Sequence, residues 1–373
     1  MRDVAIVGGG PVGLLLACLL AQRGVDVAVF EHREAIAPRA RAFGIHPPGL
    51  AMLDEAGVGR AARAEAVPIR DGVALRGRTG LGRLAFDPPV LSVPQHRVEA
   101  LLETRLHAIA PGALQRGTAV LSARHRTHRF EVGLRRGDAE TTTSEEARYL
   151  VAADGVHGIV PGRVGIGRRQ RRGAAHYVMA DAPDTTGMPD RAVLHFEPDG
   201  VVESFPAPGG LRRWVVRHEP PGVLDARAFA ALVNARVGAG LDPAATSEPS
   251  GFAARQGLAD RFARGRVALV GDAAHEISPI GGQGMNLGWI DAGHLAAAIV
   301  AALADGAPGA PFEAYAAARR RAAARAIRRA SFNMAMGAPA RGVVRGGRDA
   351  ATRVLATAPF RGILTGAFTM RGL

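Results

Sequence analysis

The sequence predicts an α/β protein in which a Rossmann-like domain is interrupted by an inserted α+β segment. Three observations predict this class. A glycine-rich turn joins a short apolar strand to an apolar helix near the N-terminus, within residues 3–23. Short strand-like runs separated by Pro and Gly lie between residues 170 and 257 and indicate antiparallel strands. A second strand, loop and helix then occupy residues 267–305, and we expect this helix to pack back on the first sheet.

Composition places the chain among globular proteins and limits its partners. Apolar residues make up 47% of the 373 residues and charged residues 22%, and this length allows about two or three domains. The formal net charge is +13, and every basic residue is an arginine. The arginine runs at 168–172 and 319–321 carry no interleaved aromatic residues, unlike the stacking surfaces that bind single strands. We therefore expect solvated surface at these runs and no nucleic-acid partner.

The single cysteine and the N-terminal apolar run favour a cytoplasmic protein. Cys18 alone forms neither an internal disulfide nor a multi-cysteine metal site, so we expect a buried apolar side chain and no metal. The lack of a disulfide framework is typical of a reducing compartment. The first apolar run is broken at residues 8–11, which makes it too short for a signal peptide or a membrane span. We expect no integral membrane segment.

The first strand and helix carry the spacing of a dinucleotide-binding turn. Gly8, Gly10 and Gly13 follow an apolar strand, and a second strand further on ends at Glu31. In this pattern the first glycine forms the turn, the second admits the pyrophosphate, and the third lets the helix pack on the strand. Glu31 lies where an acid binds the ribose hydroxyl pair. An acid there disfavours a 2′-phosphate, so the site is predicted to hold FAD or NAD rather than NADP.

Three polar side chains after this unit are candidates for ligand contact. Arg33 and Arg41 could reach the pyrophosphate or the rim of a ligand channel, and the alternative is that they are exposed. Gln95 begins a clean amphipathic helix, where a polar side chain can serve a ligand or cap the helix. The sequence leaves both alternatives open for each residue.

Two more strands end in an aspartate beside a glycine. Asp154 follows the apolar run 150–153, and Asp272 follows the run 267–270. The second aspartate opens a glycine-dense loop, residues 271–286, that leads into a long apolar helix. Such a loop lets backbone N–H groups approach a ligand closely, and the helix N-terminus adds partial positive charge. The segment therefore suits electron-rich oxygen atoms or an anionic ring, although an ordinary connection would have similar glycines.

The inserted segment offers groups that could contact a phenol or an apolar ring. These are His176, Tyr177, His195, Trp214 and His218. Successive side chains on a strand point to opposite faces, so about half of them must face away from any ligand. The sequence does not say which half.

The order of these three motifs resembles the group A FAD-dependent monooxygenases of the para-hydroxybenzoate hydroxylase type. The resemblance covers nearly the whole chain and implies a GR2-type FAD-binding domain, an antiparallel substrate sheet and C-terminal helices. It also implies a division into three parts. The discontinuous FAD-binding domain comprises residues 1–70, 92–168 and 258–336, the substrate-binding domain residues 71–91 and 169–257, and the C-terminal helical tail residues 337–373.

The resemblance also implies roles for individual residues. Glu31 would bind the adenosine ribose, and Arg41 and Gln95 would approach the pyrophosphate and ribityl region, with Arg33 and Asp154 as further cofactor contacts. Asp272 would bind the ribityl chain. The backbone of the loop would face the flavin ring, with Pro279 beside it and Gly281, Gly282, Gly284, Met285 and Asn286 at its pyrimidine edge. Pro279, Gly281, His195 and His218 are the candidate catalytic positions.

The implied activity is hydroxylation of an aromatic, phenolic or polyketide-type small molecule. NADPH or NADH would reduce FAD as a transient co-substrate, and O₂ would then give a C4a-hydroperoxyflavin that delivers the hydroxyl group. No second GxGxxG is present for the nicotinamide cofactor, as expected for this family. A monomer or homodimer is expected.

The sequence departs from the family in one motif and leaves two alternative functions open. Gly158 and Pro161 stand where the family has a serine and an arginine after Asp154-Gly155, with Arg163 as a partial substitute. A flavin-dependent epoxidase or reductase acting on isoprenoid or other apolar substrates stays possible, because aromatic residues make up only 5%. A catalytically silent FAD-binding protein is the other alternative. The absence of lysine and the wide separation of the two tryptophans exclude a flavin-dependent halogenase.

Overall fold

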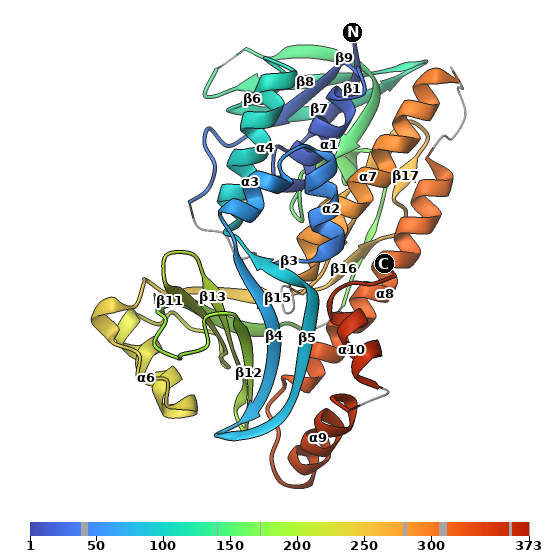
Figure 1. The fold of residues 1–373 in the computed structure, drawn as a ribbon. Coiled ribbons are helices and arrows are strands. Elements are labelled where there is room, and N and C mark those ends of the chain that lie inside the picture. The colour runs from blue at the N-terminus through green and yellow to red at the C-terminus, as the bar shows by residue number, and fades with distance from the viewer. Residues whose placement is uncertain are drawn as a thin grey trace.

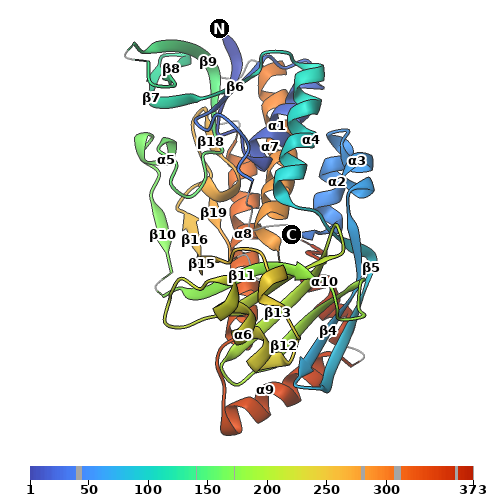
Figure 2. The ribbon, with the colours of Figure 1, turned by 90° about the vertical axis from the view of Figure 1, so that its left-hand side faces the viewer.

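The computed structural model describes residues 1–38, 44–139, 141–171, 173–278, 282–305, 312–357 and 360–372. Two large sheets organise these residues, one in the upper half of the molecule and one in the lower half (Figure 1). A small sheet of β10 (Arg168–Gln170), β16 (Gly257–Ala259) and β19 (His275–Glu276) lies between them (Figure 2).

The upper sheet has a parallel centre. β1 (Arg2–Val7) pairs in parallel with β2 (Val27–Glu31) on one side and with β9 (Thr143–Ala152) on the other. β18 (Val267–Leu269) extends this arrangement beside β9, and β6 (Leu114–Arg116) extends it beside β2. Parallel strands with both faces covered are expected to be continuously apolar, and β1, β2 and β18 are almost entirely buried.

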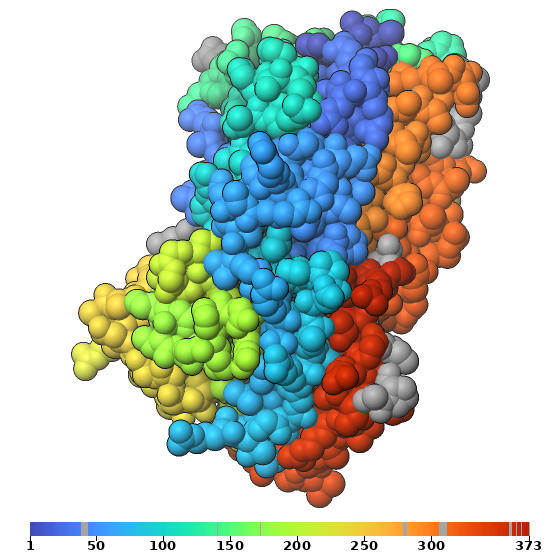
Figure 3. Space-filling model, in the orientation of Figure 1, coloured from blue at the N-terminus to red at the C-terminus, as the bar shows by residue number. Residues whose placement is uncertain are grey.

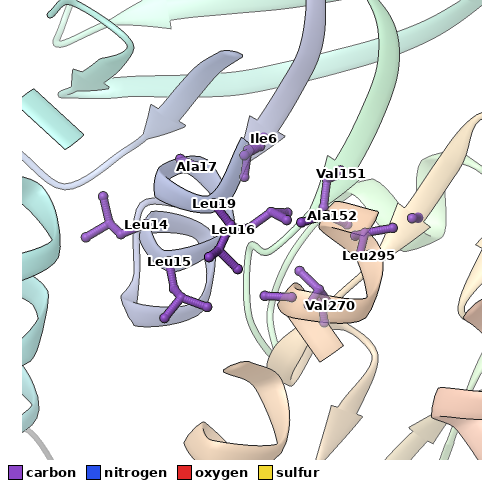
Figure 4. Packing of buried hydrophobic residues seen from close by; sticks show 14 of the residues in the cluster. Ile6, Leu14, Leu15, Leu16, Ala17, Leu19, Val151, Ala152, Val270 and Leu295 are labelled. Carbon is purple, nitrogen blue, oxygen red and sulfur yellow. The ribbon is translucent and has the colours of Figure 1, made fainter. Parts of the chain in front are cut away.

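Neighbouring helices that pack on one another cover one face of this parallel centre, and β7 (Thr118–Arg126) contacts β2 (Figure 2). The helices are α1 (Pro11–Ala21), α4 (Gln95–Ile109) and α7 (Gln283–Ala304), with α2 (Pro47–Glu55), α3 (Gly59–Ala64) and α8 (Glu313–Met336) outside them. Leu14, Leu16 and Leu19 of α1 pack with Ile6, Val151 and Leu295 in one fully buried cluster (Figure 4). Cys18 is also fully buried, as predicted.

Antiparallel strands extend the upper sheet. β7 pairs with β8 (Arg129–Arg136), β8 pairs with β9, and β17 (Ala263–Arg264) pairs with β18. Residues 143–147 are mostly polar, yet they form the start of β9, where they pair with β8.

The lower sheet is mostly antiparallel and has the order β15-β11-β14-β13-β12-β4-β5-β3. Its strands are β3 (Gly44–Ile45), β4 (Val67–Arg76), β5 (Thr79–Ser92), β11 (Ala175–Pro183), β12 (Arg191–Glu197), β13 (Gly200–Ala207), β14 (Leu211–Arg217) and β15 (Ser250–Ala254). The short runs predicted from the sequence thus correspond to real strands. The helix α6 (Ala226–Val237) lies between β14 and β15 in the chain, and Asp225 caps it by accepting a hydrogen bond from the Ala228 N–H at 2.7 Å.

The lower sheet has two differently covered faces. One face, with Val178, Val202 and Val216, packs against α6. The opposite face, with Met179, Val201 and Val215, packs against the end of α8. The tail forms α9 (Gly342–Leu355) and α10 (Phe360–Phe368), which lie alongside β5 (Figure 3). The tail is therefore helical, as predicted.

α7 is the one helix in the described part of the chain that is long and apolar enough to cross a membrane. More than half of its most apolar window is buried inside the fold, at 56%. It packs against α1, α2 and α8, and its Trp289 is fully buried. The packing accounts for the apolar composition of this helix.

Candidate cofactor site

A long cavity of about 790 Å³ opens beside the carboxyl ends of β1, β2 and β9. Four segments line it, namely the turn between β1 and α1, the end of β2, the Asp154 segment, and the segment around Asp272 and the start of α7. Ligands of open α/β sheets bind at this edge, and the volume falls in the range of small-molecule sites. The three sequence motifs therefore meet at one place.

The β1–α1 turn depends on glycine at two positions. Gly8 has φ +106°, and a Cβ atom there would lie 2.2 Å from the Ala153 carbonyl oxygen. A Cβ atom on Gly13 would lie 2.0 Å from the Gly8 carbonyl oxygen, so any side chain would push α1 away from the turn. Gly8 and Gly10 line the cavity, whereas Gly13 packs behind them. The turn thus brings a helix N-terminus close to a bound ligand.

Glu31 ends β2 inside the cavity as an ionised, almost fully buried acceptor. Its Oε2 accepts a hydrogen bond from the Gly9 N–H at 2.8 Å, and its Oε1 accepts one from Arg33 Nε at 2.9 Å. Burial alone would raise the pKa of Glu31, but the contacts with Arg33 and Gly9 outweigh burial and hold its pKa below the usual value. Arg33 also lines the cavity, so the predicted acid and the predicted arginine form an ion pair on the cavity wall.

α4 contributes a pair of side chains one turn apart. Gln95 lines the cavity and donates from Nε2 to Glu99 Oε1 at 2.7 Å. Glu99 also lines the cavity, and burial raises its pKa, which Gln95 only partly offsets. The sequence analysis missed Glu99, although its position four residues after Gln95 on the same helix face was a usable signal.

The unusual Gly158 is explained by the position of Asp154. The Asp154 side chain turns back over the following residues, and its Oδ2 accepts a hydrogen bond from the Val160 N–H at 3.1 Å. A Cβ atom on Gly158 would lie 2.1 Å from Asp154 Cγ. The glycine is therefore required by this carboxylate conformation. Burial raises the pKa of Asp154. Pro161 lies in the short helix α5 (Val160–Arg163) that follows.

The loop before α7 reaches the cavity at both of its described ends. Asp272, whose side chain is exposed, lines the cavity at one end, and Gly282, Gly284 and Met285 line it at the other. Gly282 is the N-cap residue of α7 and has φ +65°. None of the side chains that the structure describes caps this helix start. The first turn of α7 therefore presents backbone N–H groups and partial positive charge near the cavity.

Asn286 does not line the cavity but holds its wall together. Its Oδ1 accepts from the His46 N–H at 2.9 Å, and its Nδ2 donates to the Gly44 and Gly282 carbonyl oxygens at 2.8 Å each. These bonds join β3 and the start of α2 to the start of α7. The Asn286 side chain therefore has a positioning role, and contact of its backbone with the cofactor stays a prediction.

Two predicted catalytic histidines lie away from the cavity. His195 pairs in register with Val202, and both face α6 on the outer side of the lower sheet. Burial, with the nearby Arg212 charge, lowers the pKa of His195 to about 4. His218 follows β14 and donates its N–H to the His176 carbonyl oxygen at 2.9 Å. The strand register decides this outcome, and the sequence did not reveal it. The predicted Arg41, Pro279 and Gly281 lie outside the described residues.

The cavity fits an oxygen-rich cofactor with hydroxyl groups. Two of its buried carboxylate oxygens, Asp154 Oδ1 and Glu99 Oε2, have no hydrogen-bond partner among the residues that the structure describes. Buried polar atoms of this kind are normally satisfied, and ribose or ribityl hydroxyl groups would donate to them. Arg255, which follows β15, and Glu276, the last residue of β19, are further polar lining residues that the sequence analysis did not single out, because neither belongs to a recognisable spacing.

Comparison with known proteins identifies the family. Residues 1–330 match the family described as FAD binding domain. The chain belongs to this family. It is 33% identical to the anhydrotetracycline monooxygenase of Streptomyces rimosus over 347 residues, which cover 87% of this chain and 68% of that protein. It is 30% identical to the para-nitrophenol 4-monooxygenase of Pseudomonas sp. strain WBC-3 over 341 residues, covering 86% of this chain and 83% of that protein.

A solved structure supports the fold along the whole chain. The p-nitrophenol 4-monooxygenase of Pseudomonas putida DLL-E4 superposes with a TM-score of 0.89 at 24% identity, covering 100% of this chain and 99% of that one. The protein is thus an FAD-dependent monooxygenase of the para-hydroxybenzoate hydroxylase-like group A type, with a mixed α/β fold. NAD(P)H and O₂ are its co-substrates, and a small molecule is its substrate.

Proposed function

We propose that this monooxygenase hydroxylates an aromatic small molecule, either a simple phenol or a polyketide-type ring system, in secondary metabolism. The observation that carries the proposal is the single cavity that joins the glycine turn, Glu31, Asp272 and the start of α7. The anhydrotetracycline and para-nitrophenol enzymes, two relatives whose names specify aromatic substrates, support the same conclusion.

The upper half is proposed to be a GR2-type Rossmann-like FAD-binding domain with the boundaries expected from the sequence. Its parallel strands β1, β2, β9 and β18 support this assignment. The antiparallel lower sheet, at residues 71–91 and 169–257, is proposed as the inserted substrate-binding domain. β4 and β5 reach slightly beyond the first of these ranges, to Val67 and Ser92.

Individual residues would divide the binding of FAD between them. Glu31 would accept hydrogen bonds from the adenosine ribose while Arg33 keeps it ionised. Asp272 would bind ribityl hydroxyl groups together with Gln95. The N–H groups of the first turn of α7 would stabilise negative charge at the pyrimidine edge of the flavin. Pro279 is proposed to lie beside the flavin ring, and Gly281 is proposed to lie at its pyrimidine edge.

Bound FAD would supply the redox and oxygen chemistry, and the protein would bind, orient and exclude water. The apolar face of the lower sheet that packs against α8 would enclose the aromatic substrate. A cytoplasmic location and a monomeric or homodimeric state are part of the same proposal.

The test is substrate-stimulated NAD(P)H oxidation by the purified yellow holoenzyme. A panel of phenols, polycyclic polyketide phenols and apolar isoprenoids would be screened for O₂ uptake, with mass spectrometry of the products. We expect an added oxygen atom on an aromatic compound. Stimulation by isoprenoids alone, with epoxide products, would favour the epoxidase alternative. A colourless protein that does not take up FAD would contradict the proposal altogether.

A further inference from the structure

Three polar side chains share the face of the lower sheet that packs against α8. Tyr177 of β11 lies opposite Arg217 of β14 in register. Glu203 of β13 lies opposite Val215, which is two residues before Arg217 on the same strand. Residues paired in register, or two apart along a strand, point to one face, so the three side chains form one cluster.

The surroundings of this cluster are apolar. Met179, Phe196, Val201, Val215 and Phe252 form a buried group on the same face, and the Tyr177 ring stacks on Phe252 with 5.5 Å between ring centroids. Glu203 is only 3% exposed. Within the described part of the chain, the Glu203 carboxyl group forms neither a hydrogen bond nor an ion pair. An apolar environment makes a buried carboxyl group costly unless it binds something.

The cluster lies on a sheet whose two edge strands, β15 and β3, both contact the cofactor half. At one edge, Phe252 pairs with Tyr177, and the next residue of β15, Ala253, points to the opposite face and lines the cofactor cavity. At the other edge, β3 is held to the start of α7 through the Asn286 bond to Gly44.

The C-terminal helix α10 closes the remaining side. Phe368 stacks on Phe86 at 5.3 Å and packs beside Phe205 on the cluster's face of the sheet. The Phe368 carbonyl oxygen accepts a hydrogen bond at 3.4 Å from Gln283, the first residue of α7. The cluster therefore lies on a sheet face that α10 covers beside the start of α7, and the edge strand β15 of the same sheet borders the cofactor cavity.

We propose that Glu203 and Tyr177 bind the ionisable hydroxyl group of a phenolic substrate, and that Glu203 accepts its proton. This inference rests on the proposed hydroxylase function and narrows its substrate class to phenols. The proton moves from the phenol oxygen to a Glu203 carboxylate oxygen, and the electron pair of the O–H bond stays on the phenolate. The Tyr177 hydroxyl then donates to the phenolate oxygen, and the positive charge of Arg217 lies nearby. A phenolate ring is more electron-rich, which favours attack on an electrophilic oxygen.

The acidity of these groups suits the assigned roles. Burial raises the pKa of Glu203 to about 7, so its carboxyl group can exchange a proton near neutral pH. Burial, followed by the Glu203 charge, raises the pKa of Tyr177, which keeps its hydroxyl protonated as a donor. Arg217 and Glu219 are the other charges that act on Tyr177. β12 and α8 present the apolar Leu194, Met334 and Met336 to this face.

The experiment compares a phenol with its methyl ether on the FAD-loaded enzyme. The probes are 4-nitrophenol, whose phenolate form absorbs visible light, and 4-nitroanisole, which has no proton to lose. Binding and phenolate absorbance are measured by difference spectroscopy from pH 5 to 9 for the wild type, Glu203→Gln and Tyr177→Phe. Glu197→Gln is the matched control, because Glu197 is a buried glutamate of the same sheet that accepts a hydrogen bond from the Gly77 N–H instead.

We expect the wild type to bind 4-nitrophenol with phenolate absorbance below the pH at which the free phenol ionises. Glu203→Gln should retain FAD and bind 4-nitroanisole normally, yet lose the phenolate band and bind 4-nitrophenol about tenfold more weakly. In the wild type, kcat/KM for phenols should change with pH near neutrality, and this change should be absent in Glu203→Gln. Tyr177→Phe should weaken phenol binding to a smaller extent, and Glu197→Gln should match the wild type.

Two results would overturn the assignment, and both differ from failure of the proposed function. The first is no saturable binding of 4-nitrophenol to the wild type, or equal binding of the phenol and the ether. The second is Glu203→Gln behaving like Glu197→Gln in binding, absorbance and pH profile. If the wild type still hydroxylates members of the aromatic panel, only the role of Glu203 fails. If it hydroxylates none of them, the proposed function fails.

Discussion

His275 Nε2 lies 2.5 Å from Asp291 Oδ2, and both side chains are completely buried. Asp291 also accepts a hydrogen bond from Arg319 Nε at its other oxygen. His275 follows the Asp272 turn, Asp291 lies in α7 and Arg319 lies in α8. The Asp291 carboxylate of α7 therefore links the segment that borders the cofactor cavity, through His275, to α8, through Arg319.

Replacing this carboxylate should destabilise the whole fold. Asp291→Asn leaves the Arg319 guanidinium, only 5% exposed, without its anionic partner. Breaking a buried charge pair in this way costs about 3–5 kcal/mol. Urea unfolding of the FAD-loaded protein measures the loss. Asp54→Asn breaks an exposed pair with Arg63 and should cost at most about 1 kcal/mol. Equal losses in the two variants would contradict the structural role of Asp291.

The close contact between α1 and the first turn predicts a cofactor defect in Gly13→Ala. The new methyl group would lie 2.0 Å from the Gly8 carbonyl oxygen, so α1 or the turn must shift. We expect purified Gly13→Ala to contain much less FAD than the wild type, measured by flavin absorbance per protein. Gly80→Ala is the control, because nothing lies within 4 Å of a Cβ atom there. Full flavin occupancy in both variants would show that the spacing is not needed.

Asp272→Ala should lose flavin during purification while remaining folded. The Asp272 side chain is exposed and lines the cavity, so its removal costs little core packing but takes away a carboxylate acceptor. A hydrogen bond to a charged group contributes about 1.5–3 kcal/mol, or at least tenfold in affinity. Titration of the apoprotein with FAD gives the dissociation constant. Asp260→Ala removes a half-exposed carboxylate paired with Arg169 and should bind FAD normally. Unchanged FAD affinity in Asp272→Ala would remove that residue from the site.

Restoring the family residue at position 158 should be harmful in this chain. In Gly158→Ser, the added Cβ atom would overlap the Asp154 carboxyl group, which must then leave the Val160 N–H. We expect weaker FAD binding and a changed rate of flavin reduction by NADPH or NADH in stopped-flow measurements. Gly162→Ser places the same side chain where nothing lies within 4 Å of the Cβ atom. Wild-type behaviour of Gly158→Ser would mean that Asp154 moves without consequence.

His195 should make the protein less stable in acid. Its pKa is about 4 in the folded state and about 6.5 in an unfolded chain. Between these values the unfolded chain binds a proton that the folded chain excludes, so stability falls as the pH decreases from about 6.5 towards 4. His195→Leu removes this effect.

The His195→Leu comparison needs only two pH values. Relative to the wild type, the free energy of unfolding of the variant should improve by about 2 kcal/mol between pH 8 and pH 5. Chemical denaturation at both values measures the difference, and a constant difference would contradict a buried neutral histidine. Turnover of the same variant tests the catalytic role that the sequence suggested for His195.

Local patterns in the chain were sufficient for the nucleotide-binding elements. Gly8, Gly10 and Gly13 predicted the turn correctly, because their spacing reflects backbone contacts within a few residues. Glu31 was predicted at the end of β2 for the same reason, since a strand of five buried residues places its last side chain at the sheet edge. Gln95 and Asp272 also line the cavity as expected, each beside the start of a helix or the end of a strand.

The lower sheet depended on contacts between distant segments. Alternation along a strand assigns His195 and Glu203 to opposite faces only after the β12–β13 register is known. The sequence offered His195 and His218 as candidate bases and overlooked Glu203, because nothing local to Glu203 reveals that β11, β14 and α8 bury it. The burial of these residues and the register of their strands depend on segments that are distant in the sequence, so the tertiary structure was needed to define them.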